Sequence, residues 1–432
     1  MLCRGWLLFL LFGLLLVVAP VAAQGGDGSP AVVGPDDYPE GVNPLTGLLV
    51  EDPDNLNRRP VLVKISNWPP VVRPQSGLSQ ADHVWEILVE GGVTRFAAIF
   101  LAQEVDHLGP VRSARLSDLP LVRYYSAIYG YSGAAQGTLD RIRADLFVAQ
   151  SAIGGGPCPP YCRFPQPGLA FEHTLYTTTA ALHQAAAEEG MVDQAVDLSG
   201  LAFQKEVPAG GIPTPGFALH YRQTTVNWEY DAASGLWLRS QDGEPQLDAN
   251  TGEPLSAANV VVFEASHIEQ DPVRENYWGT ANYAFEVRLV GEGRAVLFRD
   301  GYYFEGRWVR PAEDDRIQFR DQEDNLLLFK PGNTWFQLVP ASWFNGYQLV
   351  IENEHAPVAT ISVPSLNLRA GPGTGFGILS AARQGTDLRL LGRDETGAWL
   401  LGRLDGMAVW AAAEFLDTGA FDVMALPLAI HN

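Results

Sequence analysis

The sequence predicts a multidomain α+β protein: a mixed α/β N-terminal domain, a β-rich second domain and a small C-terminal β-barrel. Three observations lead to this prediction. The chain has 432 residues, which is enough for two or three domains. Hydrophobic residues make up 47% of it and charged residues only 18%, so there is ample material for cores. Near residue 213 the pattern changes from alternating strands and helices to short strands separated by turns.

The first 43 residues are predicted to be export and connecting segments. Residues 1–23 have the pattern of a signal peptide: Arg4 is followed by an almost wholly apolar run, and Ala22 and Ala23 offer small residues for cleavage. An uncleaved N-terminal anchor is the alternative, and only then would the membrane be a partner. Residues 24–43 are rich in Gly, Pro and Asp and are predicted to be a flexible linker. We therefore expect an exported protein, extracellular or in the cell envelope.

The N-terminal α/β domain is predicted to cover residues 44–212. Gly91 and Gly92 separate two apolar runs and predict a hairpin, because glycine adopts positive φ without steric cost. Ser117 and Thr138 are expected to cap two helices, and Gly190 to end a third. The expected strands are 61–65, 83–89, 94–102 and 127–131, and the expected helices are 119–125, 139–146 and 179–189.

The β-rich second domain is predicted to cover residues 213–345 and to be antiparallel, because short apolar runs alternate there with turn residues. Residues 346–358 are predicted to be a linker, and residues 419–432 a tail. The expected strands are 225–230, 237–239, 259–263, 284–289, 295–299 and 335–339.

Two cysteines follow the signal segment, Cys158 and Cys162. In an oxidising compartment we expect a local disulfide between them. A redox-active pair is the alternative, although the spacing differs from the two-residue gap of thioredoxin-like sites.

Charge and motif content restrict the partners. The formal net charge is −21, which argues against nucleic acid as a partner. The eight histidines show no metal-ligand spacing, and no nucleotide loop precedes a helix. We therefore predict no metal site and no cofactor.

An ordered series of short sequence motifs between Asn43 and about Pro340 resembles the motifs of the YerB-like family of bacterial envelope proteins. The resemblance implies a two-part domain of unknown function in an envelope setting, and it implies no reaction. The chain departs from the common family form in lacking a lipid-anchor cysteine, in its two cysteines at 158 and 162, and in Thr174, where the family has Asn. The matching motifs are residues 43–48, 73–82, 89–96, 109–115, 173–177, 248–255, 259–262 and 301–310.

Residues 359–418 resemble a bacterial SH3-like domain, chiefly through the motif at residues 366–374 and two later tryptophans. The resemblance implies a small β-barrel that binds peptidoglycan or its peptides. Its candidate wall-binding residues are Arg369, Thr374, Phe376 and Trp410. The alternative for Trp410 is a core role, because buried tryptophan commonly stabilises small barrels.

Four arginines are the candidate ligand-binding residues of the main body: Arg73, Arg95, Arg112 and Arg115. They fall at predicted strand ends or loops, where α/β sheets place ligands, and guanidinium groups bind phosphate or carboxylate in bidentate fashion. The alternative is a structural network in which each arginine pairs with a nearby acid.

Three further residues are candidates for the same pocket. Glu86 and Glu90 lie four residues apart and could serve as an acid/base pair, or could pair with arginines. His173 could act as a base or ligand, or be a hydrogen-bonded structural residue.

The sequence therefore predicts a secreted envelope protein of unknown activity. We expect it to bind an anionic or glycan ligand through an arginine-rich pocket and the cell wall through its SH3-like domain. The alternative is an enzyme that acts on cell-wall polymers or lipid-linked glycan phosphates, and the sequence identifies no catalytic residue.

Overall fold

The computed structural model describes residues 31–277, 280–341, 347–352, 357–404, 407–426 and 429. The predicted signal peptide, the start of the predicted linker and the end of the predicted tail lie outside these residues. Within the described ranges, no helix combines the length and the apolar character that a membrane span requires.

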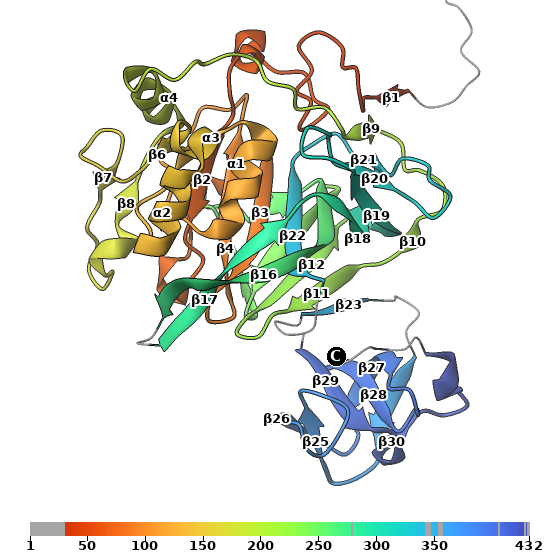
Figure 1. The fold of residues 1–432 in the computed structure, drawn as a ribbon. Coiled ribbons are helices and arrows are strands. Elements are labelled where there is room, and N and C mark those ends of the chain that lie inside the picture. The colour runs from red at the N-terminus through yellow and green to blue at the C-terminus, as the bar shows by residue number, and fades with distance from the viewer. Residues whose placement is uncertain are drawn as a thin grey trace, which may run out of the picture.

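One 12-stranded sheet runs through both predicted halves of the main body (Figure 1). β17 (Thr280–Arg288) pairs with β16, and β20 (Gln318–Arg320) pairs with β19. The other strands follow in spatial order: β10 (Ile212–Pro213), β19 (Tyr302–Arg310), β18 (Gly291–Arg299), β16 (Asn259–Tyr277), β22 (Thr334–Pro340), β3 (His83–Val89), β4 (Val93–Phe100), β2 (Val61–Ile65), β5 (Ile128–Gly130) and β6 (Ala152–Ile153).

The two halves join at β22, a strand from late in the chain. It pairs in parallel with β16 on one side and with β3 on the other. Successive side chains of a strand point to opposite faces, and the core follows this alternation: Val261 and Phe263 pack on one face, Val260 and Val262 on the other. The sheet is therefore buried on both faces along its centre, as its long apolar runs require.

Different layers cover the two faces of this sheet. Helices α1 (Leu119–Tyr125), α2 (Gln136–Ala144) and α3 (Leu146–Ala149) pack on one face, where Leu121, Val122 and Ile142 enter the core. On the other face lie α4 (Thr179–Glu188), through Leu182, and a second sheet. This six-stranded sheet comprises β14 (Glu244–Pro245), β13 (Leu236–Gln241), β12 (Thr225–Asp231), β11 (Gly216–His220) and β23 (Gln348–Ile351), with β15 (Ser256–Ala257) paired to β13.

Smaller elements complete the main body. A three-stranded sheet joins β1 (Val32–Val33), β9 (Ala202–Gln204) and β21 (Leu328–Phe329), and β7 (Cys162–Arg163) pairs with β8 (Leu175–Tyr176). The 3-10 helices are η1 (Pro53–Asn57), η2 (Pro70–Val72), η3 (Leu78–Gln80), η4 (Leu116–Asp118), η5 (Phe171–His173), η7 (Ala413–Phe415) and η8 (Val423–Ala425).

The C-terminal unit is a seven-stranded antiparallel sheet with its own apolar core. Among the described strands, β26 and β30 form its two ends, and the assignment to the SH3-like class stays a prediction. The spatial order is β26 (Ile378–Arg383), β25 (Ser365–Arg369), β29 (Met407–Ala412), β28 (Trp399–Leu404), β27 (Asp387–Arg393), β24 (Val358–Ile361) and β30 (Leu416–Asp417).

Several sequence predictions differ from the structure. The second half is not purely antiparallel, because β22 pairs in parallel with both of its neighbours. Thr138 is buried inside α2, whose N-cap position is Ala135. Part of each predicted linker is a strand: β1 lies within 24–43, and β23 lies within 346–358 and pairs with β11. For the three strands, β1, β22 and β23, the pairing partner comes from a distant part of the chain, which local patterns do not record.

The disulfide prediction is confirmed: Cys158 and Cys162 are bonded. The bond closes a short loop directly before β7.

Asp82, directly before β3, gives a pH-dependent contribution to stability. Burial raises the pKa of its carboxyl to about 6, although Leu101 N–H (2.6 Å) and Asn43 Nδ2 (2.8 Å) donate to it. In the unfolded chain the pKa is about 3.9. The folded state therefore binds this proton more tightly, so the stabilising contribution is present below about pH 4 and is lost as pH rises through about 6.

We predict that Asp82→Asn removes this pH dependence. Between pH 4 and 7 the free energy of unfolding of the parent should fall relative to that of the variant by about 2 kcal/mol. Urea unfolding of both proteins at a series of pH values measures the difference. A constant difference across this range would contradict the assignment.

Candidate functional site

The four predicted arginines do not form one group. Arg73 lies apart, at the six-stranded sheet: its Nη1 is 3.0 Å from Asp242 Oδ2, and its Nη2 donates to the carbonyl of Asn67 (3.1 Å). The other three lie near Lys64, on β2. Arg95 and Arg115 both lower the pKa of Lys64 by charge repulsion, after the larger effect of burial. Arg112 N–H donates to the carbonyl of Lys64 (2.8 Å).

We call Lys64, Arg95, Arg112, Arg115 and His173 the basic edge. β2 and β5 are parallel, so their carboxyl ends meet at one edge of the sheet, which is where open α/β sheets bind ligands. Backbone hydrogen bonds hold the loops together there: the N–H of residue 132 donates to the carbonyl of Arg112 (3.0 Å), and the N–H of residue 114 to the carbonyl of residue 133 (2.8 Å).

Two cations of the basic edge have internal acid partners. Arg115 Nε lies 2.7 Å from Glu90 Oε2, with both side chains buried, and Lys64 forms a buried ion pair with Asp118. Arg95 donates to the carbonyl of residue 113 (3.3 Å) and Arg112 to that of residue 172 (3.1 Å). Glu90 is therefore engaged with Arg115.

His173, the last residue of η5, is the fifth member of the basic edge. Only 5% of the residue is exposed, and its Nδ1 has no hydrogen-bond partner among the described residues. Its pKa is lowered by burial first, then by the positive charge of Arg112; Glu172 opposes this, and Arg95 adds to it. The imidazole is therefore neutral at neutral pH.

Glu86 belongs to a different, fully buried network. Its Oε2 accepts from Arg239 Nη2 (2.7 Å), and its Oε1 accepts from Thr94 Oγ1 (2.6 Å) and Asn67 Nδ2 (3.4 Å). The side chains of Glu86 and Arg239 have no exposed surface. Glu86 and Glu90 thus lie in separate ion pairs, and Glu86 links the two sheets of the main body.

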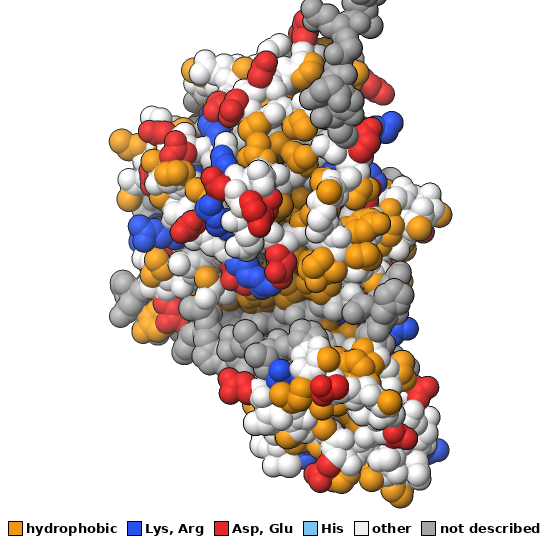
Figure 2. Space-filling view, turned by 90° about the vertical axis from the view of Figure 1, so that its right-hand side faces the viewer, with side chains coloured by type: hydrophobic (Ala, Val, Ile, Leu, Met, Phe, Trp, Pro, Cys, Tyr) orange, Lys and Arg blue, Asp and Glu red, His pale blue; other side chains and the backbone are white. Residues whose placement is uncertain are grey.

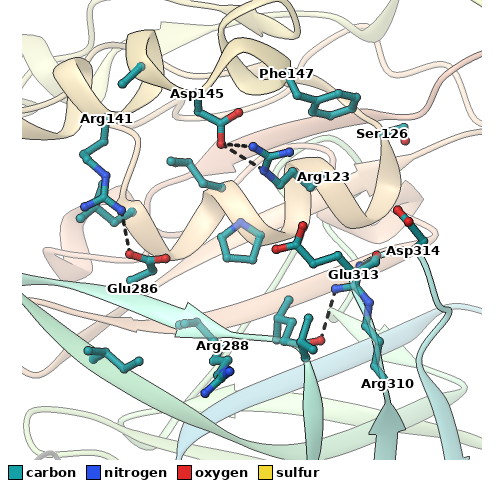
Figure 3. Close-up of a pocket in the computed structure, with 18 of the residues that line it drawn as sticks. Arg123, Ser126, Arg141, Asp145, Phe147, Glu286, Arg288, Arg310, Glu313 and Asp314 are labelled. Carbon is teal, nitrogen blue, oxygen red and sulfur yellow. Dashed lines mark hydrogen bonds and ion pairs between the residues drawn. The ribbon is translucent and has the colours of Figure 1, made fainter.

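A cleft of about 830 Å³, absent from the sequence predictions, separates the helical layer from the second half (Figure 3). Arg123, Arg141, Asp145 and Phe147 reach it from the helices. From the opposite side come side chains of β17, of the last residue of β19 and of the segment after it: Glu286, Arg288, Arg310, Glu313 and Asp314. Arg316, from the same segment, also lines the cleft. Five arginines and four carboxylates therefore line one space.

Most of these cleft arginines have partners. Arg123 pairs with Asp145 (2.6 Å), and Arg141 pairs with Glu286 (2.9 Å). Arg310 and Arg316 hold the segment after β19 through backbone carbonyls and lie over the ring of Tyr124.

Arg288 differs from the other cleft arginines. It is exposed and forms no ion pair with any residue that the structure describes. On the face shown in Figure 2, acidic, basic and apolar side chains are interspersed.

The candidate wall-binding residues separate into two places. Arg369 Nη1 donates to the carbonyls of Thr374 (3.0 Å) and Phe376 (2.7 Å), so it shapes the loop before β26. The ring of Phe376 is partly exposed. Trp410 is buried among apolar residues of the C-terminal unit and of the main body, which places it as a packing residue. Its neighbours there are Ala218, Val350, Leu391, Leu401 and Ala408.

Within the described ranges, no group of three or more His, Cys, Asp or Glu side chains gathers as metal ligands would.

The arginines of the cleft were missed because they belong to ordinary helix and strand surfaces in the sequence. Arg123 and Arg141 fall on predicted helices and Arg288 on a predicted strand, but these positions alone do not indicate a cleft.

We predict that the Glu86–Arg239 pair is required for stability. Glu86→Ala leaves a buried, unpaired guanidinium and should lower the free energy of unfolding by about 3–5 kcal/mol, whereas Glu86→Leu combined with Arg239→Met should recover most of the loss. Urea unfolding measures both. The control Glu292→Ala removes an exposed partner of Arg307 and should cost less than about 1 kcal/mol. Equal losses in the two single variants would contradict the prediction.

Comparisons with known proteins identify the main body. Residues 45–192 match the N-terminal domain, and residues 217–336 the C-terminal domain, of a protein family of unknown function (DUF3048). A Bacillus subtilis protein named "Putative lipoprotein YerB" is 31% identical over 304 residues, covering 69% of this chain and 86% of that protein. The crystal structure of Bacillus subtilis YerB superposes with a TM-score of 0.58 at 29% identity, covering 71% of this chain and 98% of that chain. The chain therefore belongs to the YerB-like (DUF3048) family.

Proposed function

We propose that this protein binds an anionic glycan of the cell envelope in the arginine-lined cleft. The observation that carries the proposal is the gathering of five arginines around one cleft in a chain of net charge −21. A chain with this net negative charge repels anions in general, so an arginine-lined cleft is a specific feature of the fold and not a result of composition. The proposed pocket therefore consists of the cleft arginines and not of the four arginines that the sequence analysis selected.

The size and chemistry of the cleft fit a short stretch of a sugar polymer. Its volume of about 830 Å³ falls in the range of small-molecule sites. The ring of Phe147 is partly exposed and can pack against the C–H face of a sugar. The carboxylates of Glu313 and Asp314 are exposed and can accept hydrogen bonds from hydroxyl groups.

The available guanidinium groups provide the anion selectivity. Arg288 forms no ion pair with a described residue, and the Arg123 and Arg141 side chains are 44% and 43% exposed. A ligand carboxylate or phosphate can therefore form charge-assisted hydrogen bonds without breaking the fold.

The C-terminal unit is proposed to hold the cell wall. Membership of a family with a relative named as a lipoprotein supports an envelope setting. Ile378 and Leu379 on β26, the end strand among those described, and Phe376 in the loop before it are exposed, at 55%, 50% and 39%. An exposed strand edge with apolar side chains can pair with an extended peptide, and wall peptides offer such a backbone.

We predict that Arg288→Ala weakens the binding of an anionic oligosaccharide about tenfold, because one charge-assisted hydrogen bond is lost. Isothermal titration with an oligogalacturonate measures this, with a neutral dextran of equal length as the reference ligand. Folding should be unchanged, since Arg288 is exposed and unpaired among the described residues.

Arg222→Ala is the matched control, because Arg222 is also exposed but does not line the cleft. Equal affinities of the parent and Arg288→Ala would reject the cleft as the binding site. Analysis of the recovered ligand tests the enzyme alternative at the same time: a shortened or transferred glycan would favour an enzyme over a binding protein.

For the wall, we predict that Phe376→Ala combined with Ile378→Ser reduces the fraction of the full chain that sediments with purified cell walls by at least about half, since apolar contact at the β26 edge is lost. Val358→Ser is the control, because Val358 is similarly exposed on β24. A parent protein that stays in the supernatant would remove the wall-binding proposal altogether.

A further inference from the structure

The unpaired charges of the cleft support an inference about its ligand. We propose that the glycan bound there contains an acidic amino sugar. Its anionic group lies at Arg288, and a free ammonium group on the same or the neighbouring sugar lies at Glu313 and Asp314. This inference rests on the proposed function, because it concerns the same cleft, and it narrows the class of ligand.

Two of the four carboxylates that line the cleft are neutralised by internal ion pairs. Asp145 lies 2.6 Å from Arg123, and Glu286 lies 2.9 Å from Arg141. These two carboxylates therefore need no positive charge from a ligand.

The other two carboxylates, those of Glu313 and Asp314, are not neutralised in this way. Both residues are exposed, and neither carboxylate forms an ion pair or a hydrogen bond with a residue that the structure describes. The pKa of Arg310 is lowered mainly by burial, and the charge of Glu313 acts against this. The N–H groups of Arg310, however, donate to backbone carbonyls, among them those of Glu313 and Asp315. A ligand with negative charge only would therefore be repelled by both carboxylates, whereas an ammonium group would complement them.

The unpaired cation of the cleft lies on the same wall as these carboxylates. Arg288 is on β17, and the carbonyl of the next residue, Leu289, accepts a hydrogen bond from Arg310 Nη1 (3.2 Å). The Nη2 of the same guanidinium donates to the carbonyl of Glu313. One guanidinium thus joins the strand that carries Arg288 to the segment that carries Glu313 and Asp314. The two charges of a ligand must therefore lie close together, within one sugar or two adjacent sugars.

The Glu313 side chain reaches from this wall into the cleft, and the Asp314 side chain points toward Ser126 (Figure 3). An ammonium group has three N–H donors, so it can bind both carboxylates at once. Such bonds are charge-assisted and stronger than those from the hydroxyl groups of a neutral sugar. An amino sugar that also carries an acidic group has this pattern of charge.

Muramic acid and N-acetylmuramic acid are a matched pair of probes, because both carry a carboxylate and only the first carries a free ammonium group. Ligand-observed NMR titrations with the full chain, at a slightly acidic pH that keeps the amine protonated, measure both affinities. We expect muramic acid to bind about fivefold more tightly, because an exposed ion pair is gained. Equal affinities, or tighter binding of N-acetylmuramic acid, would overturn the inference.

Variants locate the preference. Glu313→Gln combined with Asp314→Asn keeps the shapes of the side chains and removes their charge, so the ratio of the two affinities should approach one. Glu188→Gln combined with Glu189→Gln is the matched control: these adjacent, exposed carboxylates lie at the end of α4, outside the cleft, and the ratio should stay at about five. Thermal unfolding checks that both variants fold. A preference that persists in the folded Glu313→Gln, Asp314→Asn variant would contradict the assignment.

Oligogalacturonate, which carries carboxylates and no amine, separates this inference from the glycan proposal. A parent protein that binds oligogalacturonate through Arg288 but does not prefer muramic acid leaves the glycan proposal in place and overturns this inference. A parent that binds none of the three ligands overturns both.

Discussion

The buried ion pair between Glu86 and Arg239 is the interaction on which the rest of the main body depends. Glu86 is in the middle of β3, at the centre of the large sheet, and Arg239 is on β13 of the second sheet. Arg239 also lies over the rings of Phe96 and Trp335, at 5.2 and 5.3 Å from their centroids. A charge without solvent contact persists only when paired and hydrogen-bonded, so the two sheets have one relative position that satisfies it.

The second constraint is the insertion of β22 between β16 and β3. The family divides the domain into N- and C-terminal parts, but here a strand from the second part completes the sheet of the first. Neither part can bury its central strand alone. The cleft follows from this arrangement, because one wall belongs to the helices of the first part and the other to β17 and the segment after β19.

Local features of the fold could be predicted from the sequence, and distant pairings could not. β2, β3 and α1 were predicted at their observed bounds, because apolar runs and a proline in the first helical turn are local signals. The parallel neighbours of β22 have no such signal. For the site, three of the four predicted arginines come together, since all lie near one sheet edge. Arg288 and its cleft depend on β17 lying against the helices, which only long-range packing determines.

The contact around Trp410 has a mechanical consequence. Trp410 packs against β11 and β23 of the main body, and Arg403 of β28 forms an ion pair with Glu352, directly after β23. Force applied to the C-terminal unit would therefore be transmitted to the six-stranded sheet through these packed side chains. If the C-terminal unit binds the cell wall as proposed, this contact would fix the orientation of the main body relative to the wall.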